Sequence, residues 1–445
     1  MDVKISPIGY EQQTIYLNRT MNKKFIITLF LLRVSFALRA QVQPTTELVG
    51  SWSGKLNIGA ISLTLVLNLE QADGYVEVTI DSPDQGAKGI GAYKEYLSDD
   101  SIAVKVEHLG MTYRARLKDG KLDGTFNQHG LSVPLVMKRG VPEVKRPQTP
   151  KPPYPYKTEE VTFRNEADSA TLAGTLTYPV GYDAKSKRKP SVVLLVTGSG
   201  LQNRDEELMG HSPFLVIADY LARHGIASLR YDDRATGASV GGDVMNATTE
   251  DFMHDAAAGI AFLRQKKAFG KVGCIGHSEG GCIAFLLGSR KKIDFLVSLA
   301  GPGVKGDTLS VEQYKRILKL QGMTANMTVS QMREIIKEDA RMRAQPMPWM
   351  QWFLDYDPSD DIRNTRCPVF ALNGDLDCQV ISSQNLPAIR NLLPSSKKNL
   401  IKEYPSLNHL FQHCSTGNVN EYSQIEETIS PEVLQDIAQW INSLK

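Results

Sequence analysis

The sequence predicts two folded domains, a small all-β domain followed by a larger α/β domain in which helices cover both faces of a mostly parallel sheet. Short runs of alternating polar and apolar residues, broken by turn signals, fill 46–139 and are typical of antiparallel strands. The segment 141–157 contains six prolines and is predicted to be a semi-rigid linker. Beyond it, apolar strands alternate with helices, which is the pattern of a parallel sheet.

Composition excludes several classes of protein. The chain has 445 residues and a net charge of +2, so no overall field favours nucleic acid or an anionic membrane surface. All five cysteines lie in the second half without C-x-x-C spacing. They therefore predict neither a disulfide scaffold nor a zinc site, although a bond between Cys378 and Cys414 stays open. We expect no metal and no cofactor.

The leader 1–40 has the outline of a signal peptide. From Met21, two lysines precede an apolar core at 25–32, and the small residue Ala40 follows. The apolar run is too short to span a bilayer. We expect translation to start at Met21, the protein to be exported to the periplasm or the cell exterior, and no stable membrane insertion after cleavage.

The predicted β domain covers 41–140. It opens with the W-x-G-x-L pattern at Trp52 and continues as a meander, which resembles lipocalin-like or fatty-acid-binding-like small barrels in pattern only. The sequence therefore favours a barrel or a sandwich. Nothing in it has catalytic spacing, so two roles stay open: a platform that binds substrate or a partner, and an appendage that stabilises the chain.

The α/β domain is predicted over 158–445. Its helices have recognisable ends: Gly225 closes one, Thr248 caps the next, and Pro431 stands in the first turn of the last. The predicted strands are 161–164, 171–178, 191–196, 226–231, 272–275, 295–299, 368–372 and 400–404, and the predicted helices are 214–224, 248–269, 279–287, 386–393 and a terminal helix from 430.

A helical insertion at about 304–356 interrupts this alternation. Insertions of this kind between sheet strands commonly cover a site as a lid. The segment is rich in methionine and aromatic residues that could line an acyl pocket or simply pack between helices; these are Met342, Met347, Trp349, Met350, Trp352 and Phe353.

A nucleophile is predicted at Ser278. It lies in K-V-G-C-I-G-H-S-E-G-G-C-I, at the G-x-S-x-G spacing of a sharp turn from a strand into a helix. Only small residues fit beside a nucleophile in so tight a bend. The helix behind it offers its first N–H groups to an oxyanion, so the N–H of Glu279 is the expected donor.

A serine hydroxyl needs a base and an acid that orients the base. The only histidines downstream are His409 and His413; His409 follows the last strand closely and is the predicted base. Asp377 is the predicted acid, because Gly374 ends its strand and a turn must follow before a carboxylate can face the histidine. Asp375 is the runner-up, and a third position, Asp307, is less favoured.

The second domain resembles the α/β-hydrolases, close to bacterial esterases and serine aminopeptidase-like members. Four motifs carry the resemblance, in order: V-T-G-S-G at 196–200, D-D-R-A-T-G-A-S at 232–239, G-H-S-E-G-G at 276–281, and L-N-G-D-L-D at 372–377 before L-N-H. The resemblance again points to Asp377 and implies that the Ser199 N–H is the second oxyanion donor. It also implies a structural ion pair between Asp233 and Arg234, and leaves open that the Glu279 side chain touches substrate.

The function that this resemblance implies is a serine esterase acting on a small ester through an acyl-enzyme. One alternative is a peptidase or amidase, in which Glu206, Glu207 or Glu279 would bind a substrate ammonium. Another is a lipid- or glycan-binding protein whose β domain recognises the ligand and whose hydrolase domain is vestigial.

Overall fold

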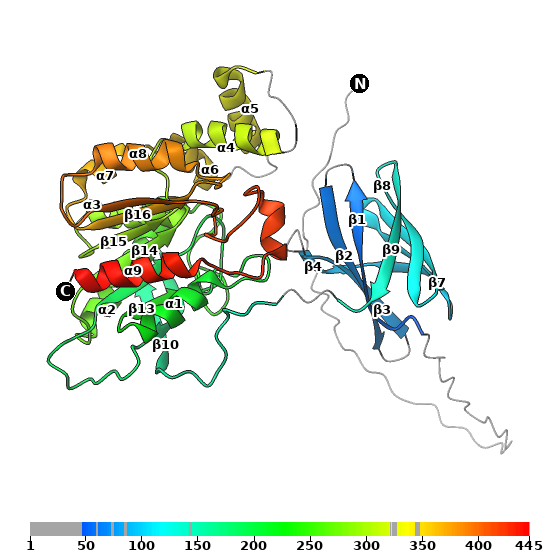
Figure 1. Cartoon of the computed structure of the whole chain (residues 1–445), viewed down its shortest axis with the longest axis horizontal. Coiled ribbons are helices and arrows are strands. Elements are labelled where there is room, and N and C mark those ends of the chain that lie inside the picture. The colour runs from blue at the N-terminus through cyan, green and yellow to red at the C-terminus, as the bar shows by residue number, and fades with distance from the viewer. Residues whose placement is uncertain are drawn as a thin grey trace, which may run out of the picture.

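The computed structural model describes residues 47–58, 61–72, 75–83, 87–141, 145–320, 322, 327–342 and 348–444. The predicted signal peptide lies outside the described residues, so export stays a prediction. In Figure 1 the β domain lies beside the α/β domain, and the helices of the insertion gather at one corner of the latter. No helix in the described part is both long and apolar enough to cross a bilayer.

The β domain is one antiparallel sheet in the order β4-β3-β2-β1-β9-β8-β7-β6-β5. One core cluster, which includes Trp52, Leu67 and Tyr113, draws side chains from strands along most of the sheet, so the sheet wraps around a single interior. Within the described residues no pairing joins β4 to β5. The domain is therefore a nearly closed barrel. The strands are β1 (Gly50–Ile58), β2 (Ile61–Ala72), β3 (Tyr75–Ser82), β4 (Ala87–Gly91), β5 (Tyr93–Leu97), β6 (Ser101–Val106), β7 (Met111–Lys118), β8 (Lys121–Gln128) and β9 (Leu131–Arg139), with the short helix η2 (Glu107–Leu109).

The linker is held to the α/β domain by Arg146. Its guanidinium donates to the carbonyls of Ile425 at 2.7 Å, Ser423 at 2.8 Å, Met209 at 3.1 Å and Gly210 at 3.2 Å. These carbonyls belong to two loops that are far apart in sequence. The arginine therefore ties both loops to the segment that leads out of the β domain.

The α/β domain contains an eight-stranded sheet in the order β10-β11-β13-β12-β14-β15-β16-β17. The first two strands are antiparallel to their neighbours, and the strands from β13 to β17 are parallel. The strands are β10 (Thr158–Asn165), β11 (Ala170–Thr177), β12 (Val192–Val196), β13 (Ala227–Tyr231), β14 (Val272–His277), β15 (Leu296–Leu299), β16 (Val369–Gly374) and β17 (Leu400–Tyr404).

Helices cover both faces of this sheet, as predicted. Alternate residues of β12 belong to different cores: Leu194 lies in the cluster that includes side chains of α2, α3 and α8, whereas Leu195 lies in the cluster that includes side chains of α1 and α9. All five residues of β12 are buried. Because the strand is covered on both faces, its sequence is apolar throughout. These helices are α1 (Pro213–Arg223), α2 (Thr249–Gln265), α3 (Glu279–Ser289), α8 (Ser382–Leu392) and α9 (Pro431–Ser443).

The predicted insertion forms α4 (Gly306–Leu320), α5 (Val329–Met342) and α6 (Pro348–Asp355). Sequence reasoning missed the short α7 (Ser359–Asn364), η3 (Val419–Gln424), and strands β4 and β5. The expected pair between Asp233 and Arg234 is wrong. Arg234 instead pairs with Asp255 at 2.7 Å and Asp168 at 3.0 Å, while Asp233 accepts from the Gln202 N–H at 2.8 Å. The two side chains of adjacent residues thus brace different loops.

Candidate active site

Ser278 lies at the turn from β14 into α3 and has φ 53° and ψ −118°. This left-handed conformation is costly for any residue with a side chain, and it is kept because the glycines around it let two backbones touch. A Cβ on Gly276 would lie 1.9 Å from the Gly280 carbonyl oxygen, and one on Gly280 would lie 2.2 Å from the Val196 carbonyl oxygen. The predicted need for small residues in this bend is confirmed.

His409 and Asp377 lie together behind the elbow. The Nδ1 of His409 lies 2.7 Å from Oδ2 of Asp377, and both side chains are buried. Because an ionised carboxylate only accepts hydrogen bonds, Nδ1 is the donor when Asp377 carries its charge. The other carboxylate oxygen, Oδ1, accepts the N–H groups of Gln379 at 2.7 Å and Val380 at 2.9 Å. The acid is therefore fixed in position, and it orients the ring so that Nε2 carries no proton and can accept one.

The alternative candidates for the acid and the base lie elsewhere or make other contacts. Asp375 accepts the Ser406 N–H at 2.7 Å. His413 pairs with Glu427 at 2.8 Å on the surface, and Asp307 belongs to α4 of the insertion. Of these residues, only Asp377 meets His409.

Ser278 and His409 line the same cavity, which has a volume of about 690 Å³. Its other walls come from the loop after β12 and from α4, α5 and α6. Trp349, Met350 and Phe353 of the insertion line it as anticipated, whereas Trp352 packs against the core and stacks on Tyr356. Met347, and the side chain of Met342, lie outside the described residues. The cavity is polar at the serine and mostly apolar under the insertion.

The loop after β12 lies against Ser278. A Cβ on Gly198 would come within 3.2 Å of the Ser278 Cβ, and Ser199 lines the cavity next to it. The Gly198 N–H is already used, since it donates to Oε1 of Glu206 at 2.8 Å. The next N–H, that of Ser199, and the Glu279 N–H at the start of α3 are the donors that this arrangement leaves for an oxyanion.

The side chain of Glu279 is buried behind residues that line the cavity. It is 3% exposed, and its Oε1 accepts from Thr249 Oγ1 at 2.6 Å and from Trp349 Nε1 at 2.7 Å. Burial raises the pKa of this carboxyl, although the hydrogen bonds from Thr249, Trp349 and Ser199 oppose the shift. Glu279 therefore anchors the insertion to the elbow helix, a contact that the sequence did not reveal.

Sequence reasoning also missed a buried pair beside the nucleophile. His277 precedes Ser278, and its Nδ1 lies 2.9 Å from Oε1 of Glu206, while its Nε2 lies 3.0 Å from the His409 carbonyl oxygen. The available signal was the histidine inside the G-x-S-x-G motif together with the acidic run that follows the Ser199 loop.

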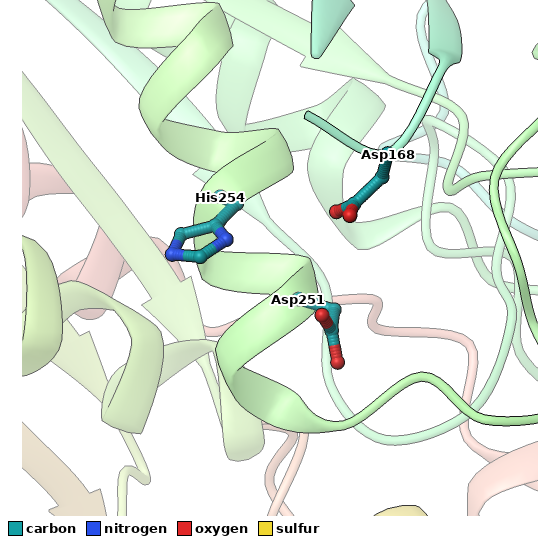
Figure 2. Close-up of side chains that lie close together, drawn as sticks. All are labelled: Asp168, Asp251 and His254. Atoms are coloured by element: carbon teal, nitrogen blue, oxygen red, sulfur yellow. The ribbon is translucent and has the colours of Figure 1, made fainter. Parts of the chain in front are cut away.

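One group could be taken for a metal site. Asp168, Asp251 and His254 offer ligand atoms within 4.8 Å of one another around the start of α2 (Figure 2). Asp168 is already paired with Arg234, and the Asp251 carboxylate receives the Thr248 N–H at 2.7 Å in a capping box. The two carboxylates thus cap the helix and neutralise an arginine. Cys378 and Cys414 are free thiols.

A sheet of this order, with a serine at a strand-to-helix elbow and a histidine–aspartate pair behind it, is the arrangement of the α/β-hydrolase fold. The α/β domain of this chain has that fold, as the four sequence motifs predicted. A profile of the family described as "Serine aminopeptidase, S33" matches residues 211–347. The esterase EstD of Thermotoga maritima is 27% identical over 278 residues, which cover 61% of this chain and 65% of EstD. The chain thus spans slightly less than two thirds of that relative.

Two solved structures are similar to about two thirds of this chain. The esterase Pf2001 of Pyrococcus furiosus is 17% identical, with a TM-score of 0.43, covering 68% of this chain and 99% of its own. Est1E of Butyrivibrio proteoclasticus, solved with ferulic acid bound, is 17% identical with a TM-score of 0.43, covering 64% of this chain and 99% of its own.

Proposed function

We propose that the protein is a serine esterase that hydrolyses small carboxylic esters through an acyl-enzyme. The observation that carries the proposal is the 2.7 Å bond between His409 and Asp377, next to a cavity that His409 shares with Ser278. Similarity to EstD, an esterase by name, supports the choice of ester over other acyl compounds.

In the proposed reaction, His409 takes the Ser278 proton at Nε2 as the serine oxygen attacks the ester carbonyl. The N–H groups of Ser199 and Glu279 stabilise the oxyanion. The histidine then protonates the leaving alcohol, activates a water molecule, and the acyl group leaves as an acid. Asp377 holds the ring and stabilises its charged form.

The apolar part of the cavity suits the acyl group. Leu309, Ile317 and Ile336 of the insertion face it together with Trp349 and Phe353. These five apolar side chains form a surface that can bury an aliphatic or aromatic acyl chain and exclude water from the ester bond. We therefore propose acyl groups longer than acetyl as preferred substrates.

A peptidase or amidase is the second candidate, because the matching profile is described as an aminopeptidase. Such an enzyme would need a carboxylate for the substrate ammonium. Glu206 is occupied by His277 and Gly198, and Glu279 by Thr249 and Trp349. Of the three glutamates considered, only Glu207 is exposed at the cavity. Because two of the three candidate carboxylates already have other partners, the esterase is favoured over the peptidase.

Matched substrates separate the two candidates. We expect p-nitrophenyl butyrate to be hydrolysed at least about a hundred-fold faster than the p-nitroanilide of an amino acid, measured as kcat/KM. A fluorophosphonate probe should label Ser278, as seen by mass spectrometry of the labelled peptide. Faster turnover of the anilide would favour the peptidase. Absence of labelling at Ser278 would favour a binding protein with an inactive hydrolase domain.

We further propose that the β domain contacts the alcohol part of the substrate. A second cavity, of about 670 Å³, lies between Lys55, Asp81 and Lys88 of the β domain and the loop that contains Glu207. Glu207 also lines the cavity that holds Ser278. A large polar alcohol that leaves the catalytic cavity along this side would therefore meet the β domain.

Removing the Lys88 ammonium should raise KM for acetylated sugars about 3- to 10-fold, the loss expected for one hydrogen bond to substrate. Lys88→Ala should leave KM for p-nitrophenyl acetate unchanged, because that alcohol is too small to reach the β domain. Lys118→Ala, an exposed lysine of β7 outside this cavity, is the matched control. Equal effects on both esters, or none on the sugars, would contradict the proposal.

A further inference from the structure

We propose that His277 is a permanent imidazolium, paired with Glu206, that positions the oxyanion loop and the general base around Ser278. The inference deepens the proposed function and rests on it for the role, although the charge state stands on geometry alone. His277 and Glu206 would be positioning residues, since the proposed chemistry passes through Ser278, His409 and the N–H donors.

The ring of His277 faces an acceptor at each nitrogen. Nδ1 lies 2.9 Å from the Glu206 carboxylate, and Nε2 lies 3.0 Å from the carbonyl oxygen of His409. A backbone carbonyl only accepts hydrogen bonds, so Nε2 must carry a proton. If Glu206 is ionised, Nδ1 must carry one as well, and the ring is then charged.

A second contact indicates that Glu206 is ionised. The same oxygen, Oε1, accepts the Gly198 N–H at 2.8 Å and lies 2.9 Å from the His277 Nδ1. An oxygen that already accepts a backbone N–H and has a ring nitrogen at hydrogen-bond distance is well placed to carry a negative charge and poorly placed to carry a proton itself. Glu206 is 2% exposed and has φ 52°, so a strained backbone places this carboxylate where the two donors meet.

The environment agrees with this charge state. Burial opposes a charged ring, but the Glu206 charge, its hydrogen bond and the His409 carbonyl outweigh burial, and the pKa of His277 is raised above its ordinary value. Other charged or titratable groups nearby are His409, whose ring centroid is 4.8 Å from that of His277, Asp377, and Asp233 beyond Glu206. Burial raises the pKa of Asp233 to about 8, which reduces its negative charge near neutral pH.

The pair connects three parts of the site. His277 belongs to the elbow strand, Glu206 holds the Gly198 N–H and so directs the next N–H, that of Ser199, and the His277 Nε2 holds the backbone of His409. The charge also matters. The positive charge of His277 offsets the negative charge of Glu206. His409 is therefore close to the negative charge of Asp377 without a second uncompensated carboxylate nearby.

Kinetics of matched variants test the role. His277→Gln should lower kcat for p-nitrophenyl butyrate about a hundred-fold with KM nearly unchanged. It should also move the acid limb of kcat/KM upward by about one pH unit, because the charge of Glu206, no longer offset by His277, then favours protonation of the base. His277→Gln/Glu206→Gln should bring the limb back while kcat stays low. His413→Gln, which removes a histidine from an exposed glutamate pair, is the control and should change neither quantity.

Ring-¹⁵N-histidine NMR of the unmodified protein tests the charge independently of any activity. At pH 8 we expect one ring with protons on both nitrogens, whose signals vanish in His277→Gln. If that variant does not fold, Glu206→Gln assigns the ring, because it should lose one of the two protons at pH 8. A neutral His277 ring at pH 8, or an acid limb that does not move in a folded His277→Gln, would overturn the proposal. Absence of esterase activity in a protein that shows the charged ring would refute the proposed function only.

Discussion

Replacing Ser278 with alanine should lower kcat for p-nitrophenyl butyrate by about a million-fold, the scale seen when the nucleophile of a serine triad is removed. Without the Oγ atom no acyl-enzyme forms, and the remaining turnover comes from the oxyanion donors and substrate binding. The fold should be unaffected, because the backbone contacts of Ser278 come from its N–H, at 2.8 Å from the Leu299 carbonyl, and its carbonyl, at 2.9 Å from the Gly281 N–H.

A serine from the far end of the same helix is the control for this experiment. Ser289 lies at the end of α3, and its hydroxyl contacts Asp361. Ser289→Ala removes this hydroxyl and should keep full activity. Circular dichroism and thermal melting of both variants establish that they are folded. Activity of Ser278→Ala within ten-fold of the unmodified protein would mean that another group attacks the ester.

Asp377→Asn should lower kcat about ten-thousand-fold while leaving the fold and KM nearly unchanged. Oδ1 of Asp377 accepts two backbone N–H groups, from Gln379 and Val380. The asparagine oxygen would keep both bonds, and its NH₂ group would then replace Oδ2 in front of the His409 ring. That group donates a proton, so Nδ1 of His409 would have to accept, and the proton would move to Nε2, the atom that must be free to activate Ser278.

Asp375→Asn is a matched control two residues away. Its Oδ1 accepts only the Ser406 N–H among the described contacts, and asparagine can keep that bond. We expect kcat of this variant to stay within about three-fold of the unmodified protein. A larger loss for Asp375→Asn than for Asp377→Asn, measured with the same ester, would reverse the assignment of the acid.

Much of this site could be predicted because its parts are local in sequence. The glycines around Ser278 indicate a sharp bend, since only residues without a side chain allow the backbone contacts measured at Gly276 and Gly280. The position of His409 just after the last strand, and of Asp377 a turn after Gly374, follows from the parallel order of strands, whose carboxyl ends meet at one edge of the sheet. These are constraints that neighbouring residues impose on one another.

Other contacts could not be predicted because they join distant segments. Arg234 was expected to pair with its neighbour Asp233, but the chain turns at Arg234, and its side chain reaches Asp255 on α2 instead. Glu279 was considered as a substrate contact, but α6 brings Trp349 onto its carboxylate. Both partners are fixed by how helices pack on the sheet, which no local pattern specifies.

The sequence by itself determined the two-domain order, the mostly parallel sheet and the sharp bend at Ser278, because hydrophobic periodicity and glycine spacing act over a few residues. Only the tertiary structure decided that Glu206 meets both His277 and the Gly198 N–H, that Glu279 anchors the insertion, and that the β domain shares a cavity with the loop that contains Glu207. The physical reason is that burial forces every charged or polar group to find a partner, and the partners within reach are set by packing between segments far apart in the chain.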